Sequence, residues 1–87
     1  MQEIFNELLA LYEAKNKDYG DSFTQSLDEF GLVAGVVRLN DKMNRIKSIV
    51  KSGTQEVSDE SLIDTLKDDA NYAVMMIQWL RNRNQGE

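Results

Sequence analysis

The chain has 87 residues, carries a formal net charge of −5 and contains neither cysteine nor histidine. One all-helical domain is expected over residues 1–87. A domain this small buries a modest share of its surface, and self-association is a common way to compensate. The missing cysteines exclude disulfides and thiolate metal sites, and the missing histidines exclude the commonest general base. Any bound metal must therefore be held by oxygen, which favours Mg²⁺ or Mn²⁺.

Charge and hydropathy narrow the class of partner. The acidic balance, with no dominant basic patch, argues against a nucleic-acid partner. No apolar run reaches the roughly 20 residues that span a bilayer, and Met1-Gln2-Glu3 lacks the basic start of a signal peptide. We therefore expect a cytoplasmic protein that contacts neither nucleic acid nor membrane.

The first third of the chain has no proline. It contains a segment with helical spacing of apolar residues, followed by a polar segment without that spacing. A helix is predicted from Gln2 to Lys15, because apolar residues recur along one of its faces. The segment from Lys15 to Phe23 interrupts that period and is predicted to be a loop with a turn at Gly20. A short helical turn is expected from Ser26 to Phe30.

Two longer helices follow. The second main helix is predicted from Gly31 to Lys51 and ends at Gly53. The third is predicted to start at an N-cap, Ser58, and to run to Asn82, before a frayed tail at residues 84–87. The predicted fold is all-α, a small antiparallel helical bundle of three main helices plus the short turn. The inward stripe of the second main helix is expected to be Leu32, Val36, Leu39, Met43, Ile46 and Val50.

The third main helix carries an acidic row. Asp64, Asp68 and Asn71 stand at i, i+4 and i+7, so their side chains share one face. Asp69 falls inside the opposite stripe, and it is expected to face a gap at the bundle edge, to pair with a basic residue, or to join a site. Half-buried carboxylates need a counter-charge, which is a cation, a basic side chain or a proton. The opposite stripe, expected to be core, is Leu62, Leu66, Ala70, Ala73, Ile77 and Leu80.

The second main helix carries a polar row that suits those acids. Arg38, Asp41, Lys42 and Arg45 stand at i, i+3, i+4 and i+7. The row is either a solvated face with intrahelical ion pairs, or it pairs with the acidic row across an antiparallel interface. Arginine forks bind carboxylates and phosphates equally well. Acids, one metal ion and arginines together are what triphosphate binding needs.

Three segments resemble a known family. They are residues 15–23 (Lys-Asn-Lys-Asp-Tyr-Gly-Asp-Ser-Phe), residues 38–45 and residues 64–73. They are similar to the nucleotide modification associated domain 1 family, whose small, often phage-encoded domains resemble the MazG-like all-α nucleoside triphosphate pyrophosphatases. The resemblance implies a MazG-like helical bundle, usually a homo-oligomer, with a magnesium-dependent nucleotide site between helices and a role in nucleotide metabolism.

The enzymatic interpretation assigns a role to each polar position. Water would attack a nucleoside triphosphate between its α and β phosphates, with a carboxylate or metal-bound hydroxide as the base. Arg38, Lys42 and Arg45 would bind phosphates. The further candidates for the substrate are Asn71, Lys17, which otherwise belongs to a solvated turn, and Tyr19, which otherwise belongs to the core. Mg²⁺ or Mn²⁺ would be held by Asp64, Asp68 and Asp41.

A second class of function stays open. MazG-like enzymes carry Glu-Glu-x-x-Glu on one helix, and this chain has no such motif. Three carboxylates are obvious for a metal, and nothing in the sequence selects among the candidates for a fourth, which are Asp18, Asp21, Asp28 and Glu29. The alternative is a non-catalytic helical module that binds a nucleotide or a protein partner, with the acids and bases as a structural network.

Overall fold

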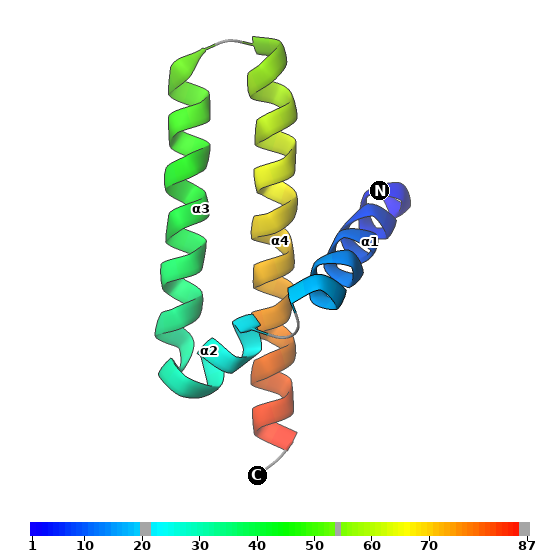
Figure 1. Cartoon of the computed structure of the whole chain (residues 1–87), viewed down its shortest axis with the longest axis vertical. Helices are drawn as coiled ribbons and strands as arrows, with labels where there is room; N and C mark the ends of the chain where they lie inside the picture. The colour runs from blue at the N-terminus through cyan, green and yellow to red at the C-terminus, as the bar shows by residue number, and fades with distance from the viewer. Residues whose placement is uncertain (20–21, 54, 86–87) are drawn as a thin grey trace.

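Four helices make up the computed structural model, which describes the backbone of residues 1–19, 22–53 and 55–85 and the side chains of residues 1–16, 22–53 and 59–83. No strand occurs among these residues, as predicted. The helices are α1 (Gln2–Tyr19), α2 (Ser22–Phe30), α3 (Leu32–Ser52) and α4 (Gln55–Gln85). Figure 1 shows α3 and α4 side by side, α2 across their open end, and α1 on the other side of α4.

Two predicted boundaries are wrong for the same reason. The segment from Lys15 to Phe23 was predicted as a loop, but α1 continues to Tyr19 and α2 begins at Ser22. Ser58 was predicted as an N-cap, but α4 begins at Gln55, so Ser58 lies within the helix. In both places the apolar period stops before the helix does. A run of polar residues does not by itself end a helix, because the backbone hydrogen bonds do not depend on apolar side chains.

Gly53 ends α3, which confirms that prediction. Its φ of 73° and ψ of 14° place it in the left-handed region, where a side chain costs energy and glycine does not. The chain then reverses, and α4 runs antiparallel to α3 (Figure 1). These two helices form the hairpin that positions the rest of the molecule.

A methionine side chain of α4 packs directly against a glycine of α3. Gly35 is buried, and a Cβ built on it would lie 2.5 Å from Cε and 2.6 Å from Sδ of Met76. Further along, Thr65 of α4 is only 3% exposed, facing α3. Glycine lets two helix backbones approach because it has no side chain to separate them. We call the line through Gly35, Thr65 and Met76 the seam.

Helix α2 closes the open end of the hairpin. Phe23 and Leu27 are the buried large apolar side chains in the described part of the chain. The Phe23 ring meets the Tyr72 ring of α4 edge to face, with centroids 4.8 Å apart. Trp79 of α4 donates its indole N–H to Asp28 at 2.8 Å. Asp28 is thus a partner of Trp79, and α2 is fixed by aromatic packing and one polar contact.

The predicted core stripes are only partly buried, which corrects the sequence analysis. On α4, Leu66 and Ile77 are 48% and 51% exposed. On α3, Val36 is 60% exposed, and Leu32, Met43 and Val50 are exposed as well. Helical periodicity shows which residues share a face, but it does not show which face meets a neighbour. The seam runs beside the apolar stripes instead of through them.

The length of α3 and α4 would suffice to cross a bilayer, since they have 21 and 31 residues. Within the described residues, however, no helix is apolar enough over such a length to be a membrane span.

The seam makes a testable prediction at Gly35. Gly35→Leu should lower the free energy of unfolding by about 1–3 kcal/mol, because the larger side chain overpacks the contact with Met76. Gly35→Ala is the matched control. It should change stability by less than about 1 kcal/mol, since the flexible end of Met76 can move and alanine gains helix propensity. Urea unfolding followed by circular dichroism measures both. Equal tolerance of the two variants would show that the helices are not this close.

Candidate functional site

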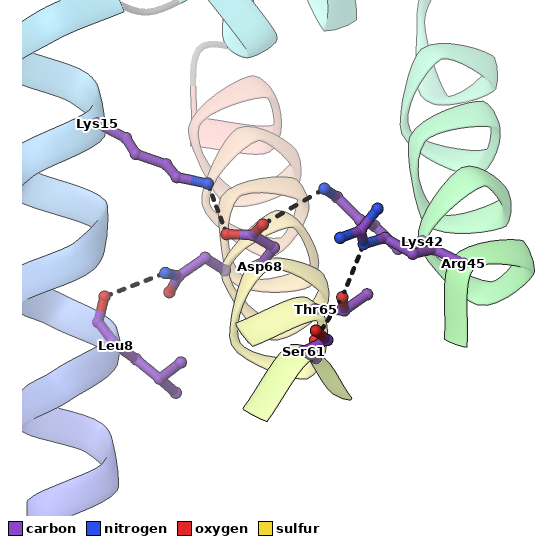
Figure 2. A network of polar contacts seen from close by, with 8 residues as sticks. Leu8, Lys15, Lys42, Arg45, Ser61, Thr65 and Asp68 are labelled. Atoms are coloured by element: carbon purple, nitrogen blue, oxygen red, sulfur yellow. Dashed lines mark hydrogen bonds and ion pairs between the residues drawn. The ribbon is translucent and has the colours of Figure 1, made fainter. Parts of the chain in front are cut away.

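One carboxylate lies between two cations from different helices. Asp68 of α4 accepts from Lys15 Nζ of α1 at 2.6 Å and from Lys42 Nζ of α3 at 3.4 Å, one lysine on each carboxylate oxygen. Figure 2 shows Asp68 between the two ammonium groups, with α1 and α3 on opposite sides of α4. The side chain of Asp68 is 20% exposed. A carboxylate this covered requires the counter-charge that the sequence analysis expected.

A second polar link joins α3 to α4 one turn away. Arg45 Nε donates to Thr65 Oγ1 at 3.2 Å, and that hydroxyl donates to the carbonyl of Ser61 at 2.9 Å (Figure 2). The hydroxyl of Thr65 is therefore satisfied as donor and as acceptor although it is buried. The guanidinium keeps its other N–H groups for further partners.

The aromatic ring of Tyr72 packs beneath two cations of α3. The guanidinium carbon of Arg38 lies 5.7 Å from the Tyr72 ring centroid, and Lys42 Nζ lies 5.8 Å from it. Both distances are within the range of cation–π attraction. Because Phe23 meets the same ring from α2, Tyr72 is held as a packed platform, as a core aromatic would be.

Helix α1 reaches the site through polar contacts. Asn71 Nδ2 donates to the carbonyl of Leu8 at 3.1 Å, and Lys67 lies 3.7 Å from Glu7. Asn71 was a candidate for substrate binding. In the structure its amide N–H holds α1 beside α4, next to the Lys15–Asp68 contact.

Two further acids among the predicted site residues make none of these polar contacts in the described part of the chain. Asp64 and Asp41 are exposed and have no ion pair within the described residues. The described side chains contain no cluster of three or more acids that would hold a metal ion. The side chains of Lys17 and Tyr19 lie outside the described residues, as do those of Asp18 and Asp21.

Asp69 has one buried oxygen, because its Oδ1 atom is covered and has no hydrogen-bond partner in the described part of the chain. The predicted alternatives were a gap at the bundle edge, a basic partner or a site. The structure shows an unpaired oxygen beside the seam.

Three residues of the site were not among the predicted set. Lys15 lies where the predicted first helix meets the predicted loop, and nothing in the sequence shows that α1 folds back onto Asp68. Thr65 sits between an acid and a leucine, and its only signal is its spacing of four from Ser61. The contact of Tyr72 with two cations depends on the orientation of α3, which the sequence does not show.

Together these residues form what we call the polar face: Lys15, Arg38, Lys42, Arg45, Asp64, Asp68 and Tyr72. Four of its members are cations and two are carboxylates. Two of the cations, Lys15 of α1 and Lys42 of α3, contact the half-buried carboxylate of Asp68, while Arg38 lies over Tyr72 and Arg45 donates to Thr65. Such a surface has the chemistry to bind an anion with several oxygens, because each cation can donate to a further partner.

Comparison with known families identifies the chain. Residues 15–79 match the family model described as nucleotide modification associated domain 1. The match covers most of the chain and includes every member of the polar face, and the chain belongs to this family. Comparison with curated proteins and with solved structures gives no significant match. The family's name connects the fold with nucleotide modification and hence with nucleotide metabolism.

Asp68 and Asp64 offer a matched pair for a stability test, because they are the same residue type one turn apart. Asp68→Asn should lower the free energy of unfolding by about 1–2 kcal/mol, since two partly exposed ion pairs are lost. Asp64→Asn should change it by less than about 0.5 kcal/mol. Raising the salt concentration should shrink the difference. Equal effects in urea unfolding would contradict the ion-pair arrangement.

Proposed function

We propose that the polar face binds the phosphate groups of a nucleotide. The observation that supports this most directly is the pair of lysines from two helices that converge on Asp68. Ammonium groups that meet at a carboxylate are positioned for phosphate oxygens as well, because both ligands present negatively charged oxygen. Membership of a nucleotide-associated family makes a nucleotide the natural source of those phosphates.

The cations around Asp68 have room for a ligand. Lys15 is half exposed, and Arg45 uses one of its N–H groups on Thr65. A phosphate chain along α3 would meet Arg38, Lys42 and Arg45 in turn, since these residues lie on one side of the helix. Several such contacts are needed for the three or four negative charges of a triphosphate.

A groove next to Arg38 would accommodate the nucleobase. It lies between α2 and α3, has a volume of about 340 Å³ and is lined by Phe30, Val33, Arg38 and Asp41 among others. Arg38 belongs both to this groove and to the Tyr72 platform. A nucleotide with its phosphates on the polar face would therefore place its base against Phe30, where stacking is favourable.

Magnesium would enter with the nucleotide. The described residues contain no three-acid cluster, so they do not fit a Mg²⁺ site in which every ligand comes from the protein. They do fit the usual arrangement for Mg²⁺, which is one or two carboxylates together with substrate phosphates. Asp68 and Asp64, one turn apart, would be the carboxylates, and Asp41 is a third candidate. The ion would neutralise phosphate charge and polarise the phosphoryl group.

The reaction we propose is hydrolysis of a nucleoside triphosphate to a monophosphate and pyrophosphate. Water attacks the α phosphorus, and the bond to the oxygen that bridges to the β phosphorus breaks. The water's protons are released to a general base of the protein and to solvent. The expected relation of the nucleotide modification associated domain 1 family to the MazG-like pyrophosphatases suggests this choice. Arg38, Lys42 and Arg45 would hold the phosphates and stabilise the leaving pyrophosphate.

A specific observation favours a second candidate, a non-catalytic binding module. Both oxygens of Asp68 already have partners within the chain. A network that is satisfied in this way stabilises the fold without any ligand. In that case the polar face would hold α1, α3 and α4 together, and the family's role would lie in binding.

Binding is tested by thermal unfolding and calorimetry with each common nucleoside triphosphate, with and without Mg²⁺. A ligand of the native state raises the melting temperature. Lys42→Met and Arg38→Met should each weaken binding about tenfold or more, because a hydrogen bond to a charged group contributes about 1.5–3 kcal/mol. Lys51→Met, at the far end of α3, is the control and should bind as the wild type does.

Two further measurements separate the candidates. Asp68→Asn should remove the dependence of binding on Mg²⁺, whereas Glu60→Gln should leave it unchanged. Release of pyrophosphate, assayed with Mg²⁺ and then Mn²⁺, would establish the hydrolase, and binding without release would establish the module. If no triphosphate binds, the hydrolase is wrong, and the module would bind a protein partner instead of a nucleotide.

A further inference from the structure

We propose that Asp41 binds the sugar hydroxyls of the nucleotide, so that the site prefers ribonucleotides to deoxyribonucleotides. This inference rests on the proposed function, because it adds a sugar contact to the phosphate contacts of the polar face. It also gives Asp41 a role other than that of a third carboxylate for Mg²⁺.

Asp41 supplies the carboxylate of the groove between α2 and α3. The groove has a volume of about 340 Å³, which is within the range of small-ligand sites. Its lining is mainly apolar, and the lining residues with polar side chains are Ser26, Arg38 and Asp41. The hydroxyl of Ser26 donates to the carbonyl of Ser22 at 3.1 Å, and Arg38 carries a positive charge. Asp41 is therefore the strongest acceptor that this groove offers to a hydroxyl group.

The groove is continuous with the polar face. Phe23 of α2 lines the groove and also meets the ring of Tyr72 edge to face. Arg38 lines the groove as well, and its guanidinium extends from α3 over that same ring. A ligand can thus occupy the groove and reach the cations of the polar face without leaving the surface of α3.

The order of residues along α3 matches the order of groups in a nucleotide. The apolar lining residues of this helix are Val33, Ala34 and Val37, and Asp41 is the lining residue furthest along it. At 1.5 Å per residue, Asp41 is about 10 Å beyond Ala34 and about 6 Å before Arg45. A nucleotide whose base lies against the apolar lining, and whose phosphates reach Arg45, places the sugar that joins them beside Asp41.

Asp41 has no ion pair in the described part of the chain, although three cations of α3 lie within one turn of it. Those cations contact α4 instead: Arg38 lies over Tyr72, Lys42 pairs with Asp68 and Arg45 donates to Thr65. An acid beside a phosphate site repels the phosphates, so its presence there requires a compensating contact. Donation from sugar hydroxyls is such a contact.

The two oxygens of a carboxylate match the two adjacent hydroxyls of ribose. The 2′ and 3′ hydroxyls can each donate to one oxygen, and hydrogen bonds to a charged acceptor are the stronger kind. Acidic side chains bind the ribose 2′ hydroxyl in this way in dinucleotide-binding domains. Deoxyribose has no 2′ hydroxyl, so it would leave one oxygen of Asp41 without a partner from the sugar. A site that bonds a hydroxyl discriminates against the analogue that lacks it.

The sugar contact is tested by calorimetry of the whole chain with ATP, GTP, CTP and UTP, each compared with its 2′-deoxy counterpart in the presence of Mg²⁺. A ribonucleotide that binds should bind about tenfold more tightly than its deoxy form, because one hydrogen bond to a charged group is lost. Inorganic tripolyphosphate, which has no sugar, measures phosphate binding alone.

Asp41→Ala should remove the preference for ribose and should bind tripolyphosphate at least as tightly as the wild type, since a negative charge is lost. The variant should fold, because Asp41 is exposed and alanine has the higher helix propensity. Asp59→Ala is the matched control. Asp59 is also exposed on a helix, but it lies near the start of α4, at the end of the hairpin away from α2 (Figure 1). This control should keep the preference.

The outcomes separate this inference from the proposed function. If tripolyphosphate binds but the wild type does not distinguish the two sugars, the sugar contact is wrong and the phosphate site stands. If Asp41→Ala loses the Mg²⁺ dependence of tripolyphosphate binding, Asp41 is a metal ligand and the sugar contact is again wrong. If neither tripolyphosphate nor any triphosphate binds, the polar face is not a nucleotide site, and this inference is overturned with that proposal.

Discussion

The antiparallel contact between α3 and α4 fixes the direction in which the other side chains of these helices point. At Gly35 the side chain of Met76 packs directly on the backbone of α3. Once that line is set, helical rotation sends Arg38, Lys42 and Arg45 of α3 and Asp64 and Asp68 of α4 to one side. The same rotation sends the largest aliphatic side chains to the other side. One close contact therefore creates both a charged surface and an apolar one.

The charged side also holds α1 in place. Its described polar contacts with α4 are the Lys15–Asp68 pair, the bond from Asn71 to the Leu8 carbonyl, and the Lys67–Glu7 pair. Contacts of this kind between partly exposed groups are individually weak. A ligand that took Lys15 away from Asp68 would therefore change the energy that docks α1. Under the proposed function, binding at the polar face and the position of α1 would be linked in both directions.

Sequence periodicity predicted the fold class and the existence of each main helix, because 3.6-residue spacing and Gly53 are local signals. It also predicted that Asp68 needs a cation and named Lys42 among the candidates. It missed Lys15, since its contact with Asp68 joins residues 53 positions apart. The sequence analysis also predicted the wrong sides of α3 and α4 to face each other. The strongest apolar stripe was assigned to the core, whereas a glycine and a threonine, which hydrophobicity alone ranks low, form the seam.

The electrostatic potential at the polar face is not set by the net charge of the whole chain. With 15 acidic and 10 basic residues the chain is acidic overall, which by itself would repel a nucleotide. Long-range repulsion is screened within about 10 Å at ordinary salt, however, so a bound anion responds to the groups around it. At Asp68 those groups are Lys15 and Lys42, and Arg38 and Arg45 lie on the same side of α3. The net charge of the chain is therefore no obstacle to the phosphate binding that we propose, because the groups nearest to the anion would be cations.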